Sequence, residues 1–323
     1  KLFKTDIKFR DEKHVLQIAQ RIAGQIGRRI DELSTMVDAR LPDGSRVNII
    51  IPPVSLGGAS ISIRKFQQQH IKLDDLVHYN SLSPQMRDFL KLAAEARLNI
   101  IISGGTGAGK TTLLNALSSL IDPSERVISI EDSAELKLLL PHVVRLESRP
   151  PNIEGAGLIT IRDLLKNALR MRPDRLVIGE CRGAEAFDML QAMNTGHNGS
   201  MSTLHSNSTR EALHRIENML LMAGHDFPNL VVKSYIADAI DLIIHVVRMK
   251  DGVRRITQIS VVEGLENENI KIEDIFLFNN ISEDKGKIKG DFQFKEIPQA
   301  LCEKIENHGA GTTLKNFLKT ISP

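Results

Sequence analysis

The sequence Gly-Gly-Thr-Gly-Ala-Gly-Lys-Thr at residues 104–111 decides the fold. It follows the apolar run from Leu98 to Ser103 and precedes a helical pattern that begins at Lys110. A G-x-x-x-x-G-K-[ST] string between a strand and a helix is typical of a P-loop. The glycine amides can curl round a phosphate there, and the helix directs its positive end at the anion. The alternative is a glycine-rich turn without a ligand, which the preceding strand makes much less favourable.

The P-loop pattern predicts which residues bind nucleotide. They are Gly104, Gly105, Thr106, Gly107, Ala108, Gly109, Lys110, Thr111 and Thr112. Lys110 is predicted to bridge the β- and γ-phosphates, Thr111 to be the Mg²⁺ ligand and Thr112 to bind the α-phosphate. The sequence has no Asn-Lys-x-Asp motif that would recognise guanine. The predicted cofactors are therefore ATP and Mg²⁺.

Strands and helices alternate from Leu98 onward. The predicted strands are residues 98–103, 126–131, 143–146, 176–179 and 199–204, and the predicted helices are residues 110–120, 161–171, 183–193 and 210–222. Such alternation implies parallel crossovers and a sheet covered on both faces. After about Ile240 the pattern becomes strand-rich, with strands predicted at 242–248, 256–263 and 270–278. The predicted fold class is α/β, with a RecA-type P-loop NTPase domain at residues 84–281.

A smaller domain is predicted before the P-loop domain. A helix at 12–26 and strands at 36–40, 46–51 and 60–66 indicate an N-terminal α+β domain at residues 1–66. The polar residues 67–83 are predicted to be a linker, and residues 282–323 a polar tail with two weak helical stretches. The opening at Lys1 is typical of the middle of a domain, so we expect a preceding segment.

Composition limits the classes of partner. Lys plus Arg (42) nearly balances Asp plus Glu (40), so no nucleic-acid partner is expected. The two cysteines, Cys181 and Cys302, exclude a disulfide framework and a multi-cysteine zinc site, and they fit a reducing cytoplasm. The apolar runs fall far short of the roughly 20 residues of a membrane-spanning helix. We therefore expect no direct membrane insertion and contact with the inner membrane through partners.

The predicted hydrolytic carboxylate ends the strand Leu176 to Gly179. Glu180 is the candidate base that orients water, while Gly179 occupies the place where P-loop enzymes usually carry a metal-side aspartate. Glu131, at the end of another apolar strand, is the predicted substitute and is expected to contact water on Mg²⁺ or the γ-phosphate, while Asp132 holds the loop. Glu180 is also expected to act on Mg²⁺ through water. The alternatives are that Glu180 starts a helix and that Glu131 and Asp132 cap a turn.

His205 ends a strand of small residues. Carboxyl ends of parallel strands share one edge of a sheet, so His205 is predicted to lie near the P-loop and Glu180 and to sense the γ-phosphate. Two histidines, His197 and His205, without a third ligand at a recognisable spacing do not predict a zinc site. The alternative is that each histidine has a structural role.

The order of these motifs resembles the secretion traffic ATPases of the type II and type IV systems along nearly the whole chain. The P-loop is followed by an acidic box (residues 130–135), an atypical Walker B motif ending in Gly179-Glu180 and a histidine box (residues 195–205). Three segments, residues 149–155, 168–175 and 191–197, are most similar in sequence to the Tad/Flp pilus assembly (CpaF-like) branch. The branch with a four-cysteine zinc module is disfavoured.

The resemblance implies a bilobed subunit, a homo-hexameric ring and inner-membrane platform proteins as partners. It also implies that N-terminal arginines complete the nucleotide site, and Arg40, Arg46 and Arg64 match in position and character. An arginine at the γ-phosphate contributes on the order of 10³ to 10⁵ in rate. The alternative is that each is a solvated strand-edge arginine. Three further arginines could act across a subunit boundary: Arg170, Arg172 and Arg175.

The predicted function is an ATP-hydrolysing motor for assembly of a Tad/Flp-type pilus or a related secretion machine, with retraction left open. A phosphotransferase is an alternative, but no Arg-rich lid insertion follows the P-loop domain. A nucleic-acid translocase or a GTPase switch is a third, which the balanced charge and the missing guanine motif disfavour.

Overall fold

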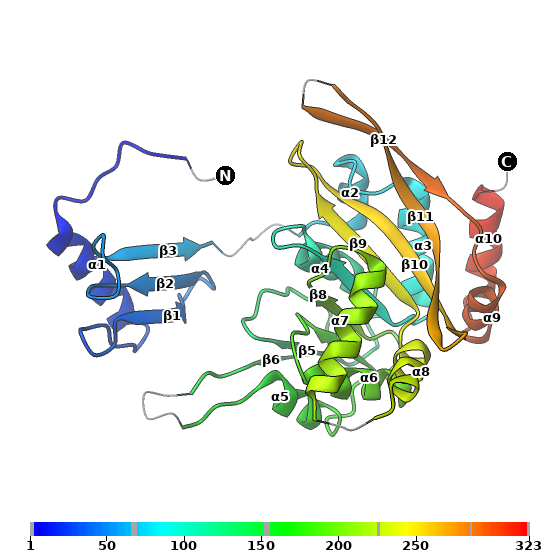
Figure 1. The fold of residues 1–323 in the computed structure, drawn as a ribbon, viewed down its shortest axis with the longest axis horizontal. Coiled ribbons are helices and arrows are strands. Elements are labelled where there is room, and N and C mark those ends of the chain that lie inside the picture. Colours follow the sequence, from blue (N-terminus) through cyan, green and yellow to red (C-terminus); the bar gives the residue numbers. More distant parts are fainter. Residues whose placement is uncertain (1–2, 66–69, 152–155, 225–226, 285, 322–323) are drawn as a thin grey trace. The chain divides into compact units, whose positions relative to one another are not determined.

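The computed structural model describes the chain except residues 1–2, 66–69, 152–155, 225–226, 285 and 322–323 (Figure 1). It divides into two units, Lys1–Gln69 and His70–Pro323. Three predictions fall in part outside the described residues: the end of the strand at 60–66, the start of the linker at 67–69, and positions 152–155 of the pilus-like segment.

The first unit is a small α+β fold. It contains α1 (Glu12–Gln25) and an antiparallel sheet in the order β1 (Met36–Arg40), β2 (Arg46–Ile50) and β3 (Ser60–Arg64). Asp11 starts the helix, because its side chain accepts a 2.8 Å hydrogen bond from the His14 amide. Ala19 and Ala23 of α1 pack with Val47 and Ile49 of the sheet. The helix thus covers one face of the sheet, and the polar residues between these positions lie on the other.

The second unit is built on a nine-stranded sheet in the order β12-β11-β10-β9-β4-β8-β7-β5-β6. Its parallel strands are β4 (Ile100–Gly104), β5 (Val127–Glu131), β6 (Val143–Glu147), β7 (Arg175–Ile178), β8 (Met201–Leu204) and β9 (Leu242–Arg248). The antiparallel strands are β10 (Arg254–Glu266), β11 (Asn269–Asp284) and β12 (Lys287–Phe294). β4, which leads into the P-loop, lies in the interior of the sheet.

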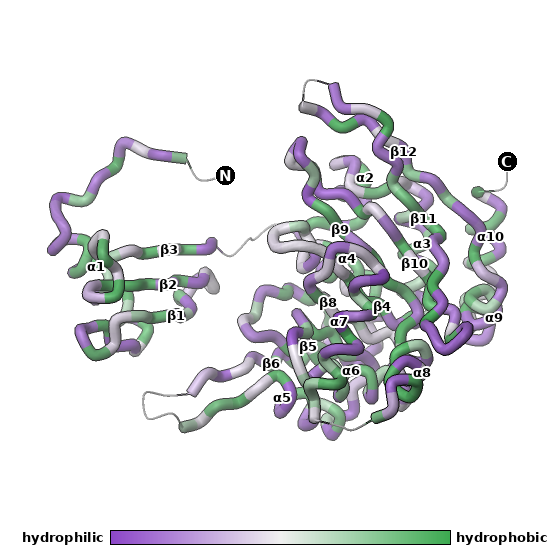
Figure 2. Tube along the Cα trace, in the orientation of Figure 1, coloured by the Kyte–Doolittle hydropathy of each residue, from purple (hydrophilic) through white to green (hydrophobic). Residues whose placement is uncertain are grey.

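Helices cover both faces of this sheet, as the alternating pattern predicted. Ile100 and Ile102 of β4 belong to one buried cluster and Ile101 to another, because successive side chains of a strand point to opposite faces. The first cluster is covered by α2 (Leu73–His78), α3 (Pro84–Glu95), α4 (Lys110–Ser118), α9 (Gln299–Asn307) and α10 (Gly311–Ile321). The second is covered by α5 (Ile161–Ala168), α6 (Glu185–Asn194), α7 (Thr209–Met222) and α8 (Asn229–Ala239). Figure 2 shows the hydrophobic central strands beneath these helices.

The segment predicted to be a linker contains a helix, since α2 packs its buried Leu73 with the larger unit. The boundary between the units therefore lies at residues 69 and 70 rather than after residue 83. Two helices and one strand of the larger unit were not predicted from the sequence: α2, α8 and β12. The short helix α2 and the edge strand β12 carry too few apolar positions for a periodic pattern to reveal them, whereas α8 has apolar residues on its exposed side too, among them Leu230 and Val231, so its period is weak.

The polar tail predicted at 282–323 is part of the larger unit. Its first residues extend β11 and form β12, and Leu301 and Phe317 of its two helices are buried in the core cluster. Lys304 of α9 forms an ion pair with the buried Asp241, and His308 Nδ1 lies 2.7 Å from Ala96 O. The tail was misread because its outer face is strongly charged, while its apolar residues occur only at every third or fourth position.

Candidate nucleotide site

The P-loop connects the end of β4 to the first turn of α4. Gly105, Thr106 and Gly107 are exposed, whereas Ala108 and Lys110 are buried beneath them. No heavy atom lies within 4 Å of the position that a Cβ would take at Gly105 or Gly107, so the loop presents an open backbone surface. Thr111 and Thr112 are half-buried in the first turn of α4. This arrangement fits a phosphate group bound by loop amides at a helix N-terminus.

Lys110 is held in the middle of this loop. Its Nζ donates to Gly104 O at 3.0 Å and Gly105 O at 3.1 Å, and it lies 3.5 Å from both ring nitrogens of His205. Burial lowers the pKa of Lys110 from its ordinary value. An ammonium whose contacts are carbonyls and an imidazole, at the positive end of a helix, makes the site attractive to an anion.

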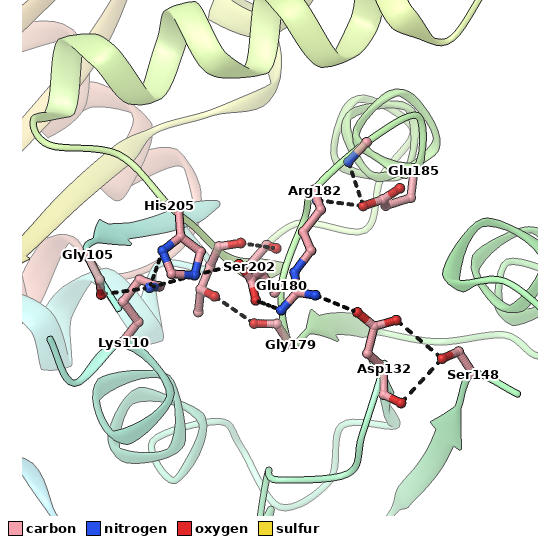
Figure 3. A network of polar contacts seen from close by, with 12 residues as sticks. Gly105, Lys110, Asp132, Ser148, Gly179, Glu180, Arg182, Glu185, Ser202 and His205 are labelled. Carbon is pink, nitrogen blue, oxygen red and sulfur yellow. Dashed lines mark hydrogen bonds and ion pairs between the residues drawn. The ribbon is translucent and has the colours of Figure 1, made fainter. Parts of the chain in front are cut away.

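Glu180 and His205 meet at the same edge of the sheet, as the sequence predicted (Figure 3). His205 Nε2 lies 2.9 Å from Glu180 Oε1. Burial and, after it, the charge of Lys110 lower the pKa of His205, so the ring is neutral at neutral pH. The ring lies against Glu180 Oε1, but this oxygen is buried without a hydrogen-bond partner among the described residues, so the two side chains are in contact without a hydrogen bond. The structure thus brings Lys110, His205 and Glu180 into one continuous contact.

The second oxygen of Glu180 binds an arginine that the sequence analysis did not single out. Arg182 Nη2 donates to Glu180 Oε2 at 2.6 Å, and Arg182 Nη1 lies 3.5 Å from Asp132 Oδ2 (Figure 3). The backbone at Arg182 is fixed as well, since its amide donates to Glu185 Oε1 at 2.6 Å. Asp132 also accepts from Ser148 Oγ at 3.2 Å. The sequence offered one indication of this role, since Arg182 follows Glu180 by only two positions.

Glu131 is placed as a buried acid rather than an exposed one. It is 2% exposed, and its Oε2 accepts hydrogen bonds from the amides of Glu135 at 2.7 Å and Leu136 at 2.8 Å. Glu131 therefore caps the turn that follows its strand, as the alternative interpretation of the sequence predicted. Among the described residues, its other oxygen, Oε1, is buried without a hydrogen-bond partner. Burial raises the pKa of Glu131 to about 7, and the two amides oppose this shift.

The Glu131 side chain explains why Gly179 has none. A Cβ at Gly179 would lie 3.0 Å from Glu131 Cγ and 3.5 Å from Glu131 Cβ. The two positions are on adjacent parallel strands, and the Gly179 amide donates to Ile130 O at 2.9 Å. The Cβ and Cγ atoms of Glu131 thus limit the space for a metal-side aspartate at position 179.

The residues fit Mg²⁺ only as a partner of phosphate. Within the part of the chain that the structure describes, no group of three His, Cys, Asp or Glu side chains could hold a metal alone. Mg²⁺ typically keeps several waters and binds phosphates with one or two protein ligands. The Thr111 hydroxyl would be such a ligand. The partnerless Oε1 of Glu131 is suited to accept a hydrogen bond from a metal-bound water.

The three N-terminal arginines form one row across the small sheet. Arg40 of β1 is opposite Arg46 of β2, which is opposite Arg64 of β3. Arg46 lies 3.4 Å from Asp38 Oδ2, and Arg40 Nε donates to Gly44 O at 3.3 Å. Arg46 and Arg64 line a hollow of about 290 Å³ on this sheet. These residues belong to the first unit, so their delivery to the nucleotide stays a prediction.

Arg175 cannot act across a subunit boundary, contrary to one interpretation of the sequence. Its guanidinium is 2% exposed and binds both carboxylate oxygens of Glu125, at 2.6 and 2.8 Å. The nearby Arg170 donates to Lys166 O, and both Arg170 and Arg172 are exposed. His197 is structural, since its Nδ1 lies 3.2 Å from Ala192 O at the end of α6.

None of the described helices combines the length and apolar character that a bilayer crossing requires.

The fold and this site define a RecA-type P-loop NTPase domain joined to a smaller α+β domain. The chain belongs to the type II/IV secretion system protein family, whose model matches residues 3–299. It is 39% identical over 271 residues to a putative conjugal transfer protein of Mycobacterium tuberculosis, covering 82% of this chain and 76% of that protein. It is 35% identical to the type IV secretion system protein PtlH of Bordetella pertussis, covering 78% and 82%.

Solved structures agree with this assignment. The VirB11 ATPase of the Brucella suis type IV secretion system, in complex with sulphate, matches with a TM-score of 0.50 and 29% identity, covering 78% of this chain and 83% of that one. The Legionella pneumophila ATPase DotB shares the fold, with a TM-score of 0.53 and 24% identity over 77% of this chain and 69% of its own. Membership of this family implies a secretion ATPase that uses a nucleotide.

Proposed function

We propose that this chain hydrolyses ATP with Mg²⁺ in a homo-hexameric ring and powers assembly of a Tad/Flp-type pilus or a related type II/IV secretion machine. Its place is the cytoplasmic face of the inner membrane, where it acts on platform proteins and not on nucleic acid. The observation that carries the proposal is the contact of Lys110, His205 and Glu180 at one edge of the sheet. These three groups supply a phosphate ligand, a sensor and a base.

The roles follow from charge and position. Lys110 and the amides of residues 104–112 bind the phosphates, and Thr111 binds Mg²⁺. Glu180, which Arg182 orients beside His205, would polarise the attacking water, and Glu131 would accept hydrogen bonds from water on Mg²⁺. MgATP supplies the reacting γ-phosphate. The protein's contribution is a set of groups fixed before the nucleotide arrives.

The arginine row of the small domain supports a motor. Like charges directly opposite each other destabilise a sheet, and an anion bound beside Arg40, Arg46 and Arg64 would offset that repulsion in addition to the Asp38 carboxylate beside Arg46. A triphosphate is such an anion. Attraction of the row to ATP, weaker after phosphate release, would open and close the subunit, because a ligand shifts an equilibrium only by its differential affinity. The machine to which the protein belongs determines whether this opening and closing extends a filament or also retracts it.

The decisive test measures nucleotide affinity, turnover and assembly mass in one set of variants. We expect Lys110→Ala to abolish binding or turnover, and Glu180→Gln to bind ATP without hydrolysing it. The exposed Lys166→Ala is the matched control and should leave both unchanged. Arg64→Ala should keep a folded, nucleotide-binding protein with turnover reduced on the order of 10³-fold. Native mass spectrometry with and without ATP should find a hexamer. Normal turnover in Glu180→Gln would remove the catalytic assignment.

A related machine is favoured by one comparison. The relatives include conjugal transfer proteins, among them TrbB of Rhizobium radiobacter, at 32% identity over 78% of this chain. DNA should not stimulate the ATPase if the protein has no nucleic-acid partner. A rise in ATPase activity on addition of DNA at moderate salt would instead indicate a conjugative machine and contradict that part of the proposal.

A further inference from the structure

An arginine outside all the family motifs lies against the P-loop. Arg254 Nε donates to Gly107 O at 3.0 Å. The stem of the side chain crosses the loop at Gly109, where a Cβ would lie 2.9 Å from Arg254 Cδ. Gly109 has a φ of +108°, so glycine is required there by backbone conformation and by the packing of this arginine. Arg254 therefore spans the rim of the loop from residue 109 to residue 107.

The sheet order places Arg254 on the side of the P-loop opposite to the hydrolytic groups. His205 and Glu180 follow β8 and β7, which lie on one side of β4, whereas Arg254 begins β10, beyond β9 on the other side. β9 runs parallel to β4, and Arg254 pairs with Arg248 near the end of β9, so it lies at the P-loop edge of the sheet. In the proposed site the γ-phosphate of a nucleotide would lie toward Glu180. Its nucleoside half consequently leaves the loop toward the other side.

The chemistry of the side chain suits that half of the ligand. Arginine carries five N–H donors on a plane that stacks on aromatic rings. Among the described residues, Gly107 O is the hydrogen-bond acceptor of Arg254, through Nε alone. The side chain is exposed, so its Nη groups face water beside the loop. We infer that Arg254 is a nucleotide-binding residue that contacts the nucleoside, its ribose and base, while its Nε fixes the P-loop at Gly107.

This inference rests on the proposed nucleotide site, and the test separates the two. The full chain is prepared as wild type, Arg254→Ala, Arg254→Lys and Arg248→Ala. The last variant removes the same charge from the neighbouring strand at an exposed position. Each is titrated with ADP and, separately, with inorganic tripolyphosphate, which has the phosphates of ATP and no nucleoside. Thermal unfolding without ligand reports the structural effect of each change.

For Arg254→Ala we expect ADP affinity to fall roughly tenfold, a change that corresponds to about 1.4 kcal/mol. Tripolyphosphate affinity should fall no more than in Arg248→Ala, and KM for ATP should rise with kcat nearly unchanged. Arg254→Lys should keep the contact with Gly107 O but restore only a small part of the ADP affinity, because lysine has no plane to stack on a base. Equal losses for ADP and tripolyphosphate would reduce Arg254 to a brace of the loop and overturn the inference. Unchanged ADP affinity would overturn it as well. Failure of the wild type to bind ADP would instead refute the proposed function.

Discussion

Replacing Glu131 with glutamine should stabilise the protein at alkaline pH while it impairs catalysis. In the native structure Oε2 accepts two amide hydrogen bonds and Oε1 is buried without a partner among the described residues. A glutamine oxygen can accept both amides, and its NH₂ group would take the place of Oε1. The substitution therefore keeps the turn and removes a buried negative charge.

The magnitude follows from the pKa of about 7 in the folded protein against an ordinary value of 4.5. Between these two values the folded state holds a proton that the unfolded state has lost, so ionisation of Glu131 costs stability as pH rises from 4.5 to 7. One pKa unit corresponds to 1.36 kcal/mol, so the cost reaches about 3 kcal/mol above pH 7 and is less than about 1 kcal/mol at pH 5. Glu131→Gln should thus match wild type at pH 5 and exceed it by about 3 kcal/mol at pH 8.

The assay is urea unfolding at pH 5 and pH 8, followed by far-UV circular dichroism because the chain contains no tryptophan. Glu303→Gln, on the exposed face of α9, is the matched control for loss of a carboxylate. The same preparations are tested for Mg²⁺-dependent ATP turnover at pH 8, where Glu131→Gln should be slower. An equal stability difference between wild type and Glu131→Gln at both pH values would refute the reasoning, because a buried ionisable group must make the difference depend on pH.

Three further substitutions test single contacts. Gly179→Asp should lower stability by about 1–3 kcal/mol in thermal unfolding, because the added Cβ must displace the Glu131 side chain 3.0 Å away; a variant as stable as wild type would show that the space is free. Arg182→Ala should lower kcat roughly tenfold with KM for ATP nearly unchanged, since it orients Glu180 without binding the phosphates; a rise in KM alone would contradict this role. Arg175→Ala should cost about 3–5 kcal/mol in calorimetry because it leaves the buried Glu125 with one remaining ion pair among the described residues, to the exposed Arg97, and a loss below 1 kcal/mol would oppose that account.

The central strands could be predicted from the sequence because both of their faces are buried. The run Leu242 to Arg248 was predicted with the bounds that β9 has, and the predicted ends of β5 and α7 differ by one residue from the structure. Near-continuous apolar runs between helical patterns permit few other interpretations. The hairpin of β11 and β12 gives the opposite case. Its outer half is polar and exposed, so its pairing follows from neighbouring strands and not from composition.

The candidate site was predictable where a residue ends a strand. Glu180 and His205 meet because parallel strands align their carboxyl ends, a rule that needs no coordinates. Arg254 was not predictable in this way. Its contact with Gly107 joins residues 147 positions apart and depends on the order of β10, β9 and β4 in the sheet. The burial of Glu131 could not be predicted either, because the sequence shows that an acid ends a strand but does not show that the following loop covers it.

The polar contacts of the site also connect the P-loop to the edge of the sheet. They run from Lys110 through His205 and Glu180 to Arg182, and from there to Asp132 (Figure 3). A phosphate bound to the Lys110 ammonium would compete with the carbonyls of the P-loop and with the imidazole of His205. Its negative charge would then lie close to the carboxylate of Glu180. Because Glu180 shares its second oxygen with Arg182, that change in charge reaches the acidic box. Coupling of this kind requires that the two ends bias one equilibrium, and a double-mutant cycle of His205 and Asp132 on nucleotide affinity would measure it.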